Sequence, residues 1–514
     1  MINQKTIEAF LNRKLADFDW IKSKSDGSLE RHLAKLNPKP DFNGVTLWRH
    51  QLACFTLLNQ LDRFIFHINM GGGKTLLTLM FLKYKKQCGL KPRAIVFVPY
   101  ITSVETWVDE CAKHTPDLKC VPLLGTTKEN LAHLQDEGDL FVICYQSAVA
   151  MLADKRTPSK WSLSPGLQAT AFGNCFNFMV CDEIHKTKSQ KSLAFQMCKW
   201  ISGRATWAIG LTGTPFGRDL QDLWPQFYLI DFGETLGRTL SLYRECFFKS
   251  KVNYWGGWEW SFKREMLPKL TKTIKNRSIH YGIDEFYDMP PRDYVPKKLH
   301  LPEASRSYVK IAMDKMREAL KGGEGAYRVV ESEYLVLRQL ASGFMTLKGE
   351  DDDRLHIKFD ENPKLEALQD LVEQMPPNCK MVVFHHFVYT NSMISDMLVN
   401  MKIRHARIWG GQRDPIGQLK KFKNDSDCRV LVINSKSGSS SLNLQNANYV
   451  CFFEQPDSPI DRQQAEARCW RPGQDKRVFY YDLLMHGTMD ERIYYANKAG
   501  EHLLKALLEG KQKL

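Results

Sequence analysis

A glycine-rich loop that carries a lysine and a hydroxyl group follows a short apolar run near residue 70. The loop, Gly71-Gly72-Gly73-Lys74-Thr75, lies between RFIFHI and the helical pattern LLTLMFLKYKK. Glycines let backbone N–H groups close around an anion at a helix N-terminus, where the helix dipole also favours negative charge. We therefore predict a nucleotide-phosphate site, in which Lys74 reaches the β- and γ-phosphates and Thr75 binds Mg²⁺. Taken alone, the loop also fits an ordinary glycine turn, because Ile68 replaces the usual first glycine.

Two adjacent carboxylates end a second apolar run. Asp182 and Glu183 open the sequence DEIH directly after FNFMVC. A carboxylate that leaves a central strand beside a phosphate loop can hold Mg²⁺, which is the role we predict for Asp182, and Glu183 can orient and deprotonate the attacking water. The alternative is a solvated acidic pair that opens a helix. Together, the loop and the pair predict an ATPase that uses ATP and Mg²⁺.

The elements that must position these residues alternate between strand and helix. Short β-branched or aromatic runs, several of them closed by Gly, Pro or Asp, predict buried parallel strands. In the first half they are RFIFHI, AIVFVP, LFVICY, FNFMVCDE and TWAIGLTG; in the second half they are MVVFHHF, RHARIWG, RVLVINS, NYVCFFE and RVFYYDLL. The pattern predicts an α/β fold of two lobes, each a doubly wound parallel sheet covered by helices.

The predicted domain boundaries follow changes in composition. We expect an N-terminal extension at 1–45, a first, ATP-binding lobe at 46–220 and a second lobe with a closing helix at 362–514. A helical insertion at 221–345 is expected because its sequence is rich in aromatic and basic residues, as in SLYRECFFKSKVNYWGGWEW. The acidic run GEDDDR favours a flexible hinge at 346–361.

The bulk composition is typical of a globular protein. The chain has 514 residues, of which 43% are hydrophobic and 25% charged, and its net charge of +14 suits a polyanionic partner such as nucleic acid. The 13 cysteines form no CxxC pair, which argues against a zinc site and favours a reducing interior. No apolar run reaches membrane-span length, and the N-terminus has no apolar signal segment. We expect a cytoplasmic protein of a bacterium or a virus-infected cell, with a nuclear location also open.

The order of motifs over residues 45–495 resembles helicase superfamily two and, within it, the SWI/SNF-type DNA translocases. Each motif alone has modest specificity, but their joint occurrence in the correct order does not arise by chance. The resemblance implies two RecA-like lobes with the insertion between motifs three and four. The similar segments are LWRHQLACFTLL, VFVPYITSVETWVDE, DEIHKTKSQKS, LTGTP with DLWPQFYLI, LRQLASGF, NPKLEAL, KMVVFHHF, INSKSGSSSLNLQNANYV and QQAEARCWRPGQ.

The resemblance also implies roles for single residues. It places Gln51, with Arg49 nearby, at the adenine base, and it assigns Gln464, Arg468 and Arg471 to catalysis. The two arginines, three residues apart on one side of an expected helix, would complete the γ-phosphate site when the lobes close. The implied DNA contacts are Pro99, Ser103, Trp107, Lys186, Lys188, Thr214, His386, Ser437 and Gly438.

Three departures from the family pattern concern the grip on DNA rather than the nucleotide chemistry. A serine run, 439–441, follows Gly438 where motif five usually carries glycines. Gln455 replaces a tryptophan that is common before motif six, and Trp470 occupies a position that is often histidine.

The resulting prediction is an ATP-driven motor that moves along duplex or branched DNA, in replication, repair or recombination, without obligatory strand separation. The aromatic insertion somewhat resembles the branch that reanneals strands and remodels forks, although core packing also explains its aromatic residues. A strand-separating DNA or RNA helicase is one alternative, and a nucleic-acid-binding protein with an inactive nucleotide site is another. We expect a monomer and leave a recruiting protein partner open.

Overall fold

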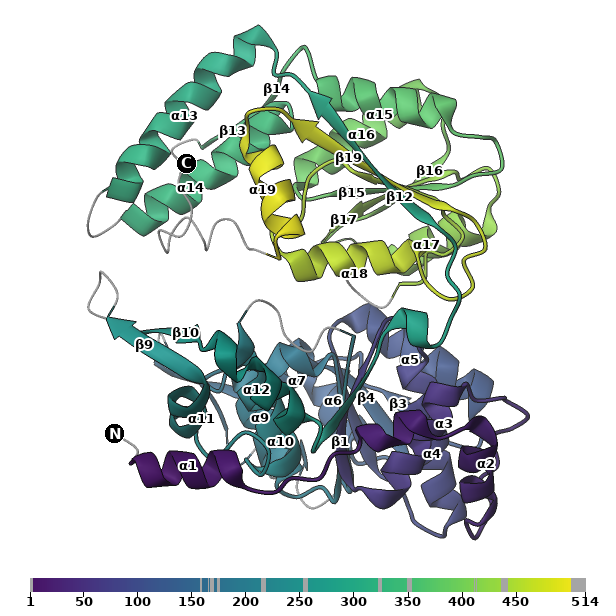
Figure 1. The fold of residues 1–514 in the computed structure, drawn as a ribbon. Helices are drawn as coiled ribbons and strands as arrows, with labels where there is room; N and C mark the ends of the chain where they lie inside the picture. The colour runs from purple at the N-terminus through teal and green to yellow at the C-terminus, as the bar shows by residue number, and fades with distance from the viewer. Residues whose placement is uncertain are drawn as a thin grey trace. The chain divides into compact units, whose positions relative to one another are not determined.

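The computed structural model describes residues 3–157, 160–164, 166, 171–172, 176–213, 219–252, 258–321, 326–348, 354–410, 412, 414–435 and 442–500. The chain divides into two compact units, Met1–Asp288 and Met289–Leu514. Each unit contains a large sheet in which all neighbouring strands are parallel (Figure 1). The predicted α/β fold with two parallel-sheet lobes is therefore confirmed.

The sheet of the first unit has the strand order β11-β1-β8-β7-β2-β4-β3. All five strands predicted in this half are present, and the two that were not predicted, β3 and β11, are the shortest. The strands are β1 (Arg63–Ile68), β2 (Ala94–Val98), β3 (Cys120–Pro122), β4 (Leu140–Cys144), β7 (Phe178–Asp182), β8 (Trp207–Thr212) and β11 (Ser278–Tyr281).

Both faces of this sheet are buried by helices, so successive strand residues enter two different cores. Phe64 and Phe66 of β1 pack into one core and Ile65 into the other. The first face is covered by α2 (Asp26–Ala34), α3 (Arg49–Gln60), α4 (Lys74–Gln87) and α5 (Ile101–His114), and the second by α7 (Tyr145–Leu152), α9 (Leu193–Ser202), α10 (Leu223–Asp231) and α11 (Leu240–Phe247). Burial on both faces explains why these strands read as continuous apolar runs.

Shorter elements surround this lobe. The predicted N-terminal extension packs onto it, because Ile21, Leu29 and Leu33 lie in the same core as α3 and α4. The elements are α1 (Gln4–Asn12), η1 (Asp19–Ser23), α6 (Thr127–His133), β5 (Ala153–Thr157), β6 (Lys160–Leu163), η2 (Ile184–Thr187), η3 (Leu220–Asp222), β9 (Phe248–Val252), β10 (Trp258–Phe262), η4 (Arg264–Met266), α12 (Leu267–Ile274) and η5 (Ile283–Glu285).

The sheet of the second unit has the strand order β12-β19-β18-β15-β17-β16. Five of its strands were predicted; the sixth, β12, lies at the edge. The strands are β12 (Arg292–Leu299), β15 (Met381–His385), β16 (His405–Ile408), β17 (Val430–Asn434), β18 (Tyr449–Phe452) and β19 (Val478–Met485).

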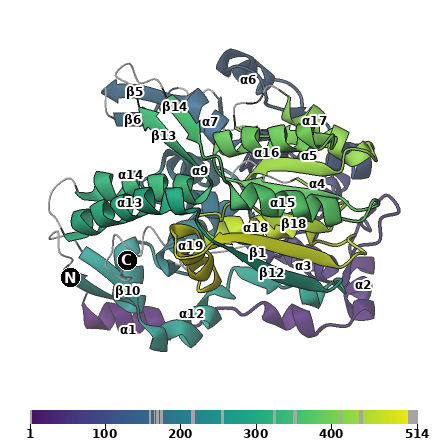
Figure 2. The same cartoon turned by 90° about the horizontal axis from the view of Figure 1, so that it is seen from above.

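Helices again bury both faces of the second sheet. One face is covered by α15 (Pro363–Gln374) and α16 (Val388–Asn400), and the other by α17 (Pro415–Asn424) and α18 (Pro459–Cys469). A separate core joins α13 (Glu303–Lys321), α14 (Ala326–Ala341) and α19 (Met489–Lys498), and α13 and α14 run side by side in Figure 2.

The division of the chain at 288/289 differs from the predicted hinge at 346–361. The stretch expected as one helical insertion, 221–345, is shared between the units, because β11 belongs to the first sheet and β12 pairs with β19 in the second. The expected hinge overlaps an antiparallel hairpin of β13 (Phe344–Lys348) and β14 (Arg354–Lys358). The acidic run 349–353 that suggested the hinge lies outside the described residues.

Part of the expected helical insertion is also a hairpin. The segments FKSKV and WEWSF form the antiparallel strands β9 and β10. Their side chains alternate between two faces with a period of two, which is the pattern of a strand rather than of a helix.

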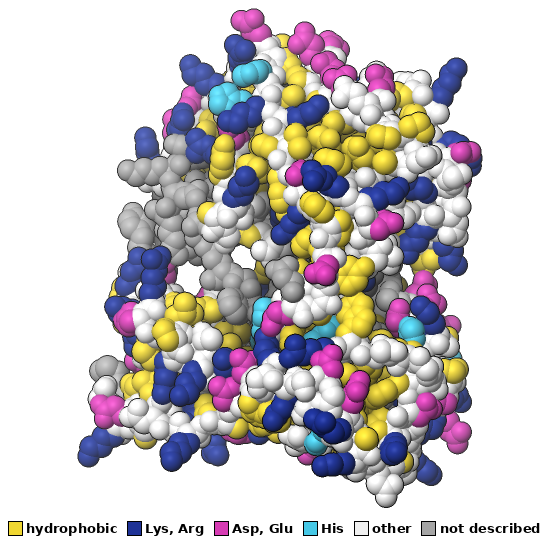
Figure 3. All heavy atoms as spheres, turned by 45° about the vertical axis from the view of Figure 1, so that its right-hand side comes forward, with side chains coloured by type: hydrophobic (Ala, Val, Ile, Leu, Met, Phe, Trp, Pro, Cys, Tyr) yellow, Lys and Arg dark blue, Asp and Glu magenta, His cyan; other side chains and the backbone are white. Residues whose placement is uncertain are grey.

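The surface carries charges of both signs. Figure 3 shows Lys and Arg side chains scattered among Asp and Glu over this face of both units, instead of gathered in one patch. Among the described helices, none combines the length and the apolar character that a membrane span requires.

Candidate nucleotide site

The glycine loop joins β1, which ends at Ile68, to α4, which begins at Lys74. Gly71 and Gly73 have φ values of 82° and 71°, a left-handed conformation that favours glycine. Packing restricts the loop as well: a Cβ atom on Gly72 would lie 2.3 Å from Cγ2 of Ile68, and one on Gly73 would lie 2.2 Å from Nε2 of Gln51. The glycines are therefore required both by the backbone and by close neighbours.

Two side chains of α3 contact the backbone of this loop at Gly72. His50 Nε2 lies 2.7 Å from the carbonyl oxygen of Gly72, and Gln51 Nε2 donates to the same oxygen at 3.2 Å. The side-chain oxygen of Gln51, Oε1, accepts from the backbone N–H of Trp48 at 2.9 Å. Gln51 is buried, so in this structure its amide shapes the loop; its predicted contact with adenine stays a prediction.

Arg49, predicted near the base, interacts with the N-terminal segment. Its guanidinium donates to the carbonyl oxygens of Lys22 and Lys24 at 2.9 and 3.0 Å and lies 3.2 Å from Asp26. Arg49 therefore ties the N-terminal segment to α3 rather than lining the loop.

Lys74 lies close to the predicted carboxylates. Its Nζ donates to the carbonyl oxygen of Ile68 at 2.8 Å. Its positive charge lowers the pKa of both Asp182 and Glu183, although it is not the largest influence on either. The loop and the DEIH segment thus lie close together and interact electrostatically, where β1 and β7 end; their role in binding a nucleotide stays a prediction.

The two carboxylates have opposite pKa shifts. Burial raises the pKa of Asp182, and the negative charge of Glu183 raises it further. Burial also acts to raise the pKa of Glu183, but the hydrogen bond and charge of His185, the charge of Lys74 and the Thr212 hydroxyl together lower it. Neighbouring acids with pKa values pushed apart are suited to different roles, and Glu183 is the one that stays ionised.

The Glu183 side chain is fixed by two residues that the sequence did not single out. Thr212 Oγ1 donates to Glu183 Oε2 at 2.8 Å, and His185 Nδ1 lies 3.2 Å from both of these oxygen atoms. Glu183 itself has a φ of 50°, an uncommon left-handed value for a non-glycine residue. The sequence offered one signal for the contact between Thr212 and Glu183, because the segments LTG and DEIH each lie where a predicted strand ends. In the structure these strands, β8 and β7, are neighbours in the sheet.

Trp107 has a different role from the predicted DNA contact. Its indole Nε1–H donates to Asp182 Oδ2 at 3.0 Å, and its side chain is only 1% exposed. Ser103 and Pro99 are buried too. This burial argues against side-chain contacts with DNA at all three positions and makes Trp107 a support for Asp182.

The remaining predicted DNA contacts of the first unit are exposed lysines or lie outside the described residues. Lys186 Nζ donates to the Tyr100 hydroxyl at 3.1 Å, and Lys188 Nζ lies 3.8 Å from Asp222. Both lysines are at the surface and are free to meet a phosphate. Thr214 lies outside the described residues, as do Ser437 and Gly438, which are predicted contacts of the second unit.

In the second unit, the predicted catalytic residues lie on and just after α18. Gln464 and Arg468 are buried members of the helix. The helix ends at Cys469, so Arg471 lies in the following turn, where its carbonyl oxygen accepts from Gln474 N at 3.0 Å. Arg468 and Arg471 therefore do not share one side of a helix, because α18 ends before Arg471.

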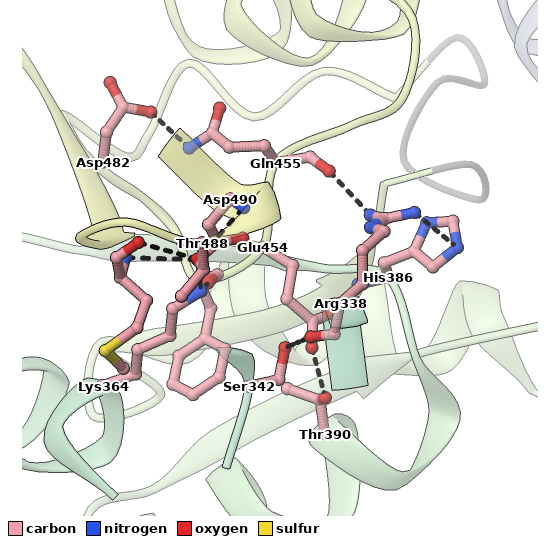
Figure 4. Close-up of polar contacts among 12 residues, drawn as sticks. Arg338, Ser342, Lys364, His386, Thr390, Glu454, Gln455, Asp482, Thr488 and Asp490 are labelled. Carbon is pink, nitrogen blue, oxygen red and sulfur yellow. Dashed lines mark hydrogen bonds and ion pairs between the residues drawn. The ribbon is translucent and has the colours of Figure 1, made fainter. Parts of the chain in front are cut away.

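A buried polar network fixes the loop that leads into α18 (Figure 4). Arg338 of α14 donates to Asp457 Oδ1 at 2.6 Å and to the carbonyl oxygen of Gln455 at 2.8 Å, and it lies 3.3 Å from His386 Nε2. Its side chain is 2% exposed. His386 is itself largely buried in this network, which argues against its predicted contact with DNA.

The same network continues along α18 and β19. Arg462 pairs with Asp482, and Gln455 Nε2 donates to Asp482 Oδ1 at 2.9 Å. The sequence offered one signal for such pairs, a charged residue inside an apolar run, as with Asp482 in RVFYYDLL. It could not indicate the partners, because Arg338 and Asp457 are 119 residues apart.

Comparison with known proteins finds two families whose models match this chain. Residues 50–324 match the SNF2-related domain, and residues 363–473 match the helicase conserved C-terminal domain. The ATP-dependent helicase fft1 of Schizosaccharomyces pombe is 24% identical over 96% of this chain and 55% of its own length. The DNA excision repair protein ERCC-6-like of Bos taurus is 24% identical over 83% of this chain and 38% of its own length.

A solved structure of the Sulfolobus solfataricus SWI2/SNF2 ATPase core in complex with dsDNA has a TM-score of 0.38 and 19% identity, with 91% of this chain and 93% of that chain covered. The chain spans about half the length, or less, of the curated relatives named above.

Proposed function

Because the chain belongs to the SNF2-related domain family, we propose that it is a DNA-dependent ATPase that translocates along double-stranded or branched DNA. The observation that supports this most strongly is the grouping of Lys74, Asp182 and Glu183 at one edge of a parallel sheet. Ligands of open α/β sheets bind at the carboxyl ends of the strands, which is where these three residues lie.

The loop at 71–75 is proposed to bind the β- and γ-phosphates of ATP. Its backbone N–H groups lie at the N-terminus of α4, where an anion is favoured. Lys74 supplies a positive charge directly after the last glycine. Lys74 Nζ donates to the carbonyl oxygen of Ile68 at 2.8 Å, and on nucleotide binding it would donate to phosphate oxygens instead. The clamp formed by His50 and Gln51 keeps the loop in shape before the nucleotide arrives, so that little ordering is needed on binding.

The donor atoms of this site fit Mg²⁺. This ion is usually held by one or two carboxylates together with substrate phosphates and water, rather than by a cage of protein ligands. Thr75 and Asp182 would supply that small set, and the described residues contain no group of three His, Cys, Asp or Glu that could hold a metal alone. When bound, the ion offsets the negative charge of the phosphates and of the buried Asp182.

Glu183 is the proposed general base. Its lowered pKa keeps it ionised near neutral pH, and Thr212 and His185 fix the orientation of its carboxylate. An ionised, oriented carboxylate can align a water molecule and accept its proton during attack on the γ-phosphate.

Gln464, Arg468 and Arg471 are proposed to complete this site from the second lobe when the lobes close. Such an arrangement would tie ATP hydrolysis to movement between the lobes, which a motor requires. Lys186 and Lys188, which follow the DEIH segment at the surface, are proposed DNA contacts.

The cellular role is proposed as replication, repair or recombination, with the protein acting as a monomer in the cytoplasm. One of the similar proteins is named for DNA excision repair. A separate recruiting protein would then choose the site of action.

The test is the ATPase rate of the purified chain with blunt duplex DNA, single-stranded DNA and RNA, together with displacement of a third strand from a triplex. We expect duplex DNA to stimulate hydrolysis most and ATP to be needed for displacement. Stimulation by RNA or single strands in preference to duplex DNA would favour a strand-separating helicase instead. ATPase activity that ignores every nucleic acid would contradict the proposal.

A further inference from the structure

The hairpin formed by β9 and β10 has two chemically different faces. In its register, Val252 pairs with Trp258, Lys251 with Glu259 and Phe248 with Phe262. Because side chains alternate along a strand, Phe248, Ser250, Val252, Trp258, Trp260 and Phe262 share one face, and Lys249, Lys251, Glu259 and Ser261 share the other. In both views the hairpin lies at the periphery of the first unit (Figures 1 and 2).

The apolar face begins in the core and ends in solvent. Phe248 is 3% exposed and packs edge-on against Phe262, with ring centres 5.5 Å apart. Trp260 also packs against this core, with the Arg244 guanidinium 5.3 Å from its ring centre. At the outer end, Trp258 is 67% exposed and Val252 60% exposed. The base of the hairpin is thus anchored, while its outer end presents a tryptophan to a ligand.

The opposite face carries two accessible cations. Lys249 and Lys251 are each 67% exposed, and their partners, Glu265 at 3.5 Å and Glu259 at 3.4 Å, form surface ion pairs. Such solvent-exposed pairs are weak, so they exchange readily for contacts with phosphate. Two residues along a strand span about 7 Å, so the lysines form a short cationic row on the face opposite Trp258.

From this geometry we infer that the β9–β10 hairpin binds unpaired DNA at a branch point, with Trp258 stacked on an exposed base of one arm and Lys249 and Lys251, on the opposite face, contacting phosphates of the other arm. Aromatic platforms combined with cations are the means by which proteins hold single-stranded nucleic acid without reading its sequence. In a duplex the bases are already stacked on one another, so Trp258 gains a base partner only where strands part. The inference rests on the proposed function and names its substrate as branched DNA.

The experiment compares two DNA molecules of the same duplex sequence, one blunt and one with two unpaired arms. Trp258→Ala should weaken binding to the forked DNA by about 5- to 150-fold, the range expected when one stacked base is lost. Its affinity for the blunt duplex should stay within about twofold, because phosphate contacts elsewhere supply that binding. Trp258→Phe keeps an aromatic ring and should retain most of the preference for the fork.

Trp20→Ala is the matched control, because Trp20 is also an exposed tryptophan of this unit, at 42% exposure, but lies on η1. It should bind both DNA molecules as the parent does. The double variant Lys249→Ala/Lys251→Ala should lower the salt dependence of fork binding, by a log–log slope of about 0.7 per lost phosphate contact.

Three results would overturn the inference: a parent protein that does not prefer the fork, a Trp258→Ala variant that keeps the preference, or a Trp20→Ala variant that loses it equally. Failure of the proposed function is a different result, namely a parent ATPase that duplex DNA does not stimulate. Melting temperatures of all variants should match that of the parent, since both tryptophans are exposed. If Trp258→Ala were unstable, the fork preference of Trp258→Phe and the salt dependence of the lysine variant would still test the inference.

Discussion

The two lobes use buried charge in contrasting ways at the ends of their parallel sheets. In the first lobe, Asp182 and Glu183 are adjacent acids that share the influence of Lys74, and burial leaves the pKa of Asp182 raised. In the second lobe, buried charges are matched in pairs, Arg338 with Asp457 and Arg462 with Asp482. A site that holds two like charges side by side can be completed by a cation, whereas a set of matched pairs holds structure in place.

This contrast suggests a division of labour between the lobes. The first lobe holds Lys74, Asp182 and Glu183, which are proposed to act on the nucleotide, and the buried pairs of the second lobe hold α18 in a defined place. A buried ion pair is weak evidence for stability, since a well-packed apolar pair is often as good, but it does define geometry. Variants of the buried pairs should therefore lose stability, whereas variants of the proposed nucleotide-site residues, Lys74 and Arg471, should lose ATP turnover.

The largest effect is expected from Arg471, the residue proposed to reach the γ-phosphate from the second lobe. Arg471→Ala should lower DNA-stimulated ATP turnover by about 10³- to 10⁵-fold, the range for an arginine that stabilises the transition state. Folding, ATP binding and weak DNA binding should change little. Steady-state ATPase assays and nucleotide binding measurements test this together.

Arg477→Ala is the control for Arg471, because Arg477 is an exposed arginine of the same unit, with a surface pair to Asp293 at 3.2 Å. It should leave turnover unchanged. If Arg471→Ala hydrolyses ATP within about threefold of the parent, the catalytic arginine is another residue.

Arg338→Met is expected to lower the stability of the fold rather than to change the ATP-hydrolysis step directly. Removing one partner of a buried ion pair leaves the other charge unmatched, which costs about 3–5 kcal/mol of unfolding free energy. Urea unfolding should show this loss in the second unit. The surface pair of Arg404 with Asp425, at 2.7 Å, provides the comparison: Arg404→Ala should cost about 1 kcal/mol or less. Equal losses in the two variants would show that the buried network does not hold the lobe.

Lys74→Ala should leave the fold intact and strongly reduce ATP hydrolysis. Loss of the cation that offsets the phosphates is expected to reduce turnover by at least about 10²- to 10³-fold, as for other preorganised charges in active sites. Lys86 lies on the same helix and pairs with Asp139 at 2.8 Å, so Lys86→Ala serves as control and should keep its activity. Near-normal ATPase in pure Lys74→Ala protein would remove the basis of the site assignment.

Local patterns predicted the strands and the loop because those features depend on neighbouring residues. Runs such as RFIFHI are buried on both faces of a sheet, so burial alone makes them continuous and apolar. β12 escaped prediction because RDYVPKKL is an edge strand, where lysines and a proline are tolerated. The segment that forms the β9–β10 hairpin was predicted to be helical. That prediction relied on its aromatic and basic composition and not on the period-two alternation of its side chains.

Contacts between distant residues could not be predicted in the same way. The sequence marked Trp107 as an implied DNA contact and gave no indication that its indole meets Asp182, 75 residues further on. The pair of Arg338 with Asp457 likewise depends on how α14 packs in the second unit. Tertiary packing decides which polar side chains meet, and a single sequence records only that they are present.

The smallest effect, and the most specific, is expected from Trp107. Its indole N–H stabilises the ionised form of Asp182 and so lowers the pKa of that carboxylate, against burial, which raises it. Trp107→Phe removes the donor and should raise the pKa of Asp182 further. A protonated Asp182 binds Mg²⁺ poorly, so activity should be lost at a higher pH than in the parent as the pH falls.

The size of the shift follows from the strength of the bond. A hydrogen bond to a charged group is worth about 1.5–3 kcal/mol, and one pKa unit corresponds to about 1.4 kcal/mol, so the acidic limb of kcat/KM should move up by about one pH unit or slightly more. At alkaline pH the variant should approach the parent, because Asp182 is then ionised in both. Trp200→Phe, in the same lobe but on α9, should leave the profile in place. A Trp107→Phe protein with reduced activity at every pH and an unmoved acidic limb would mean that Trp107 contributes packing alone.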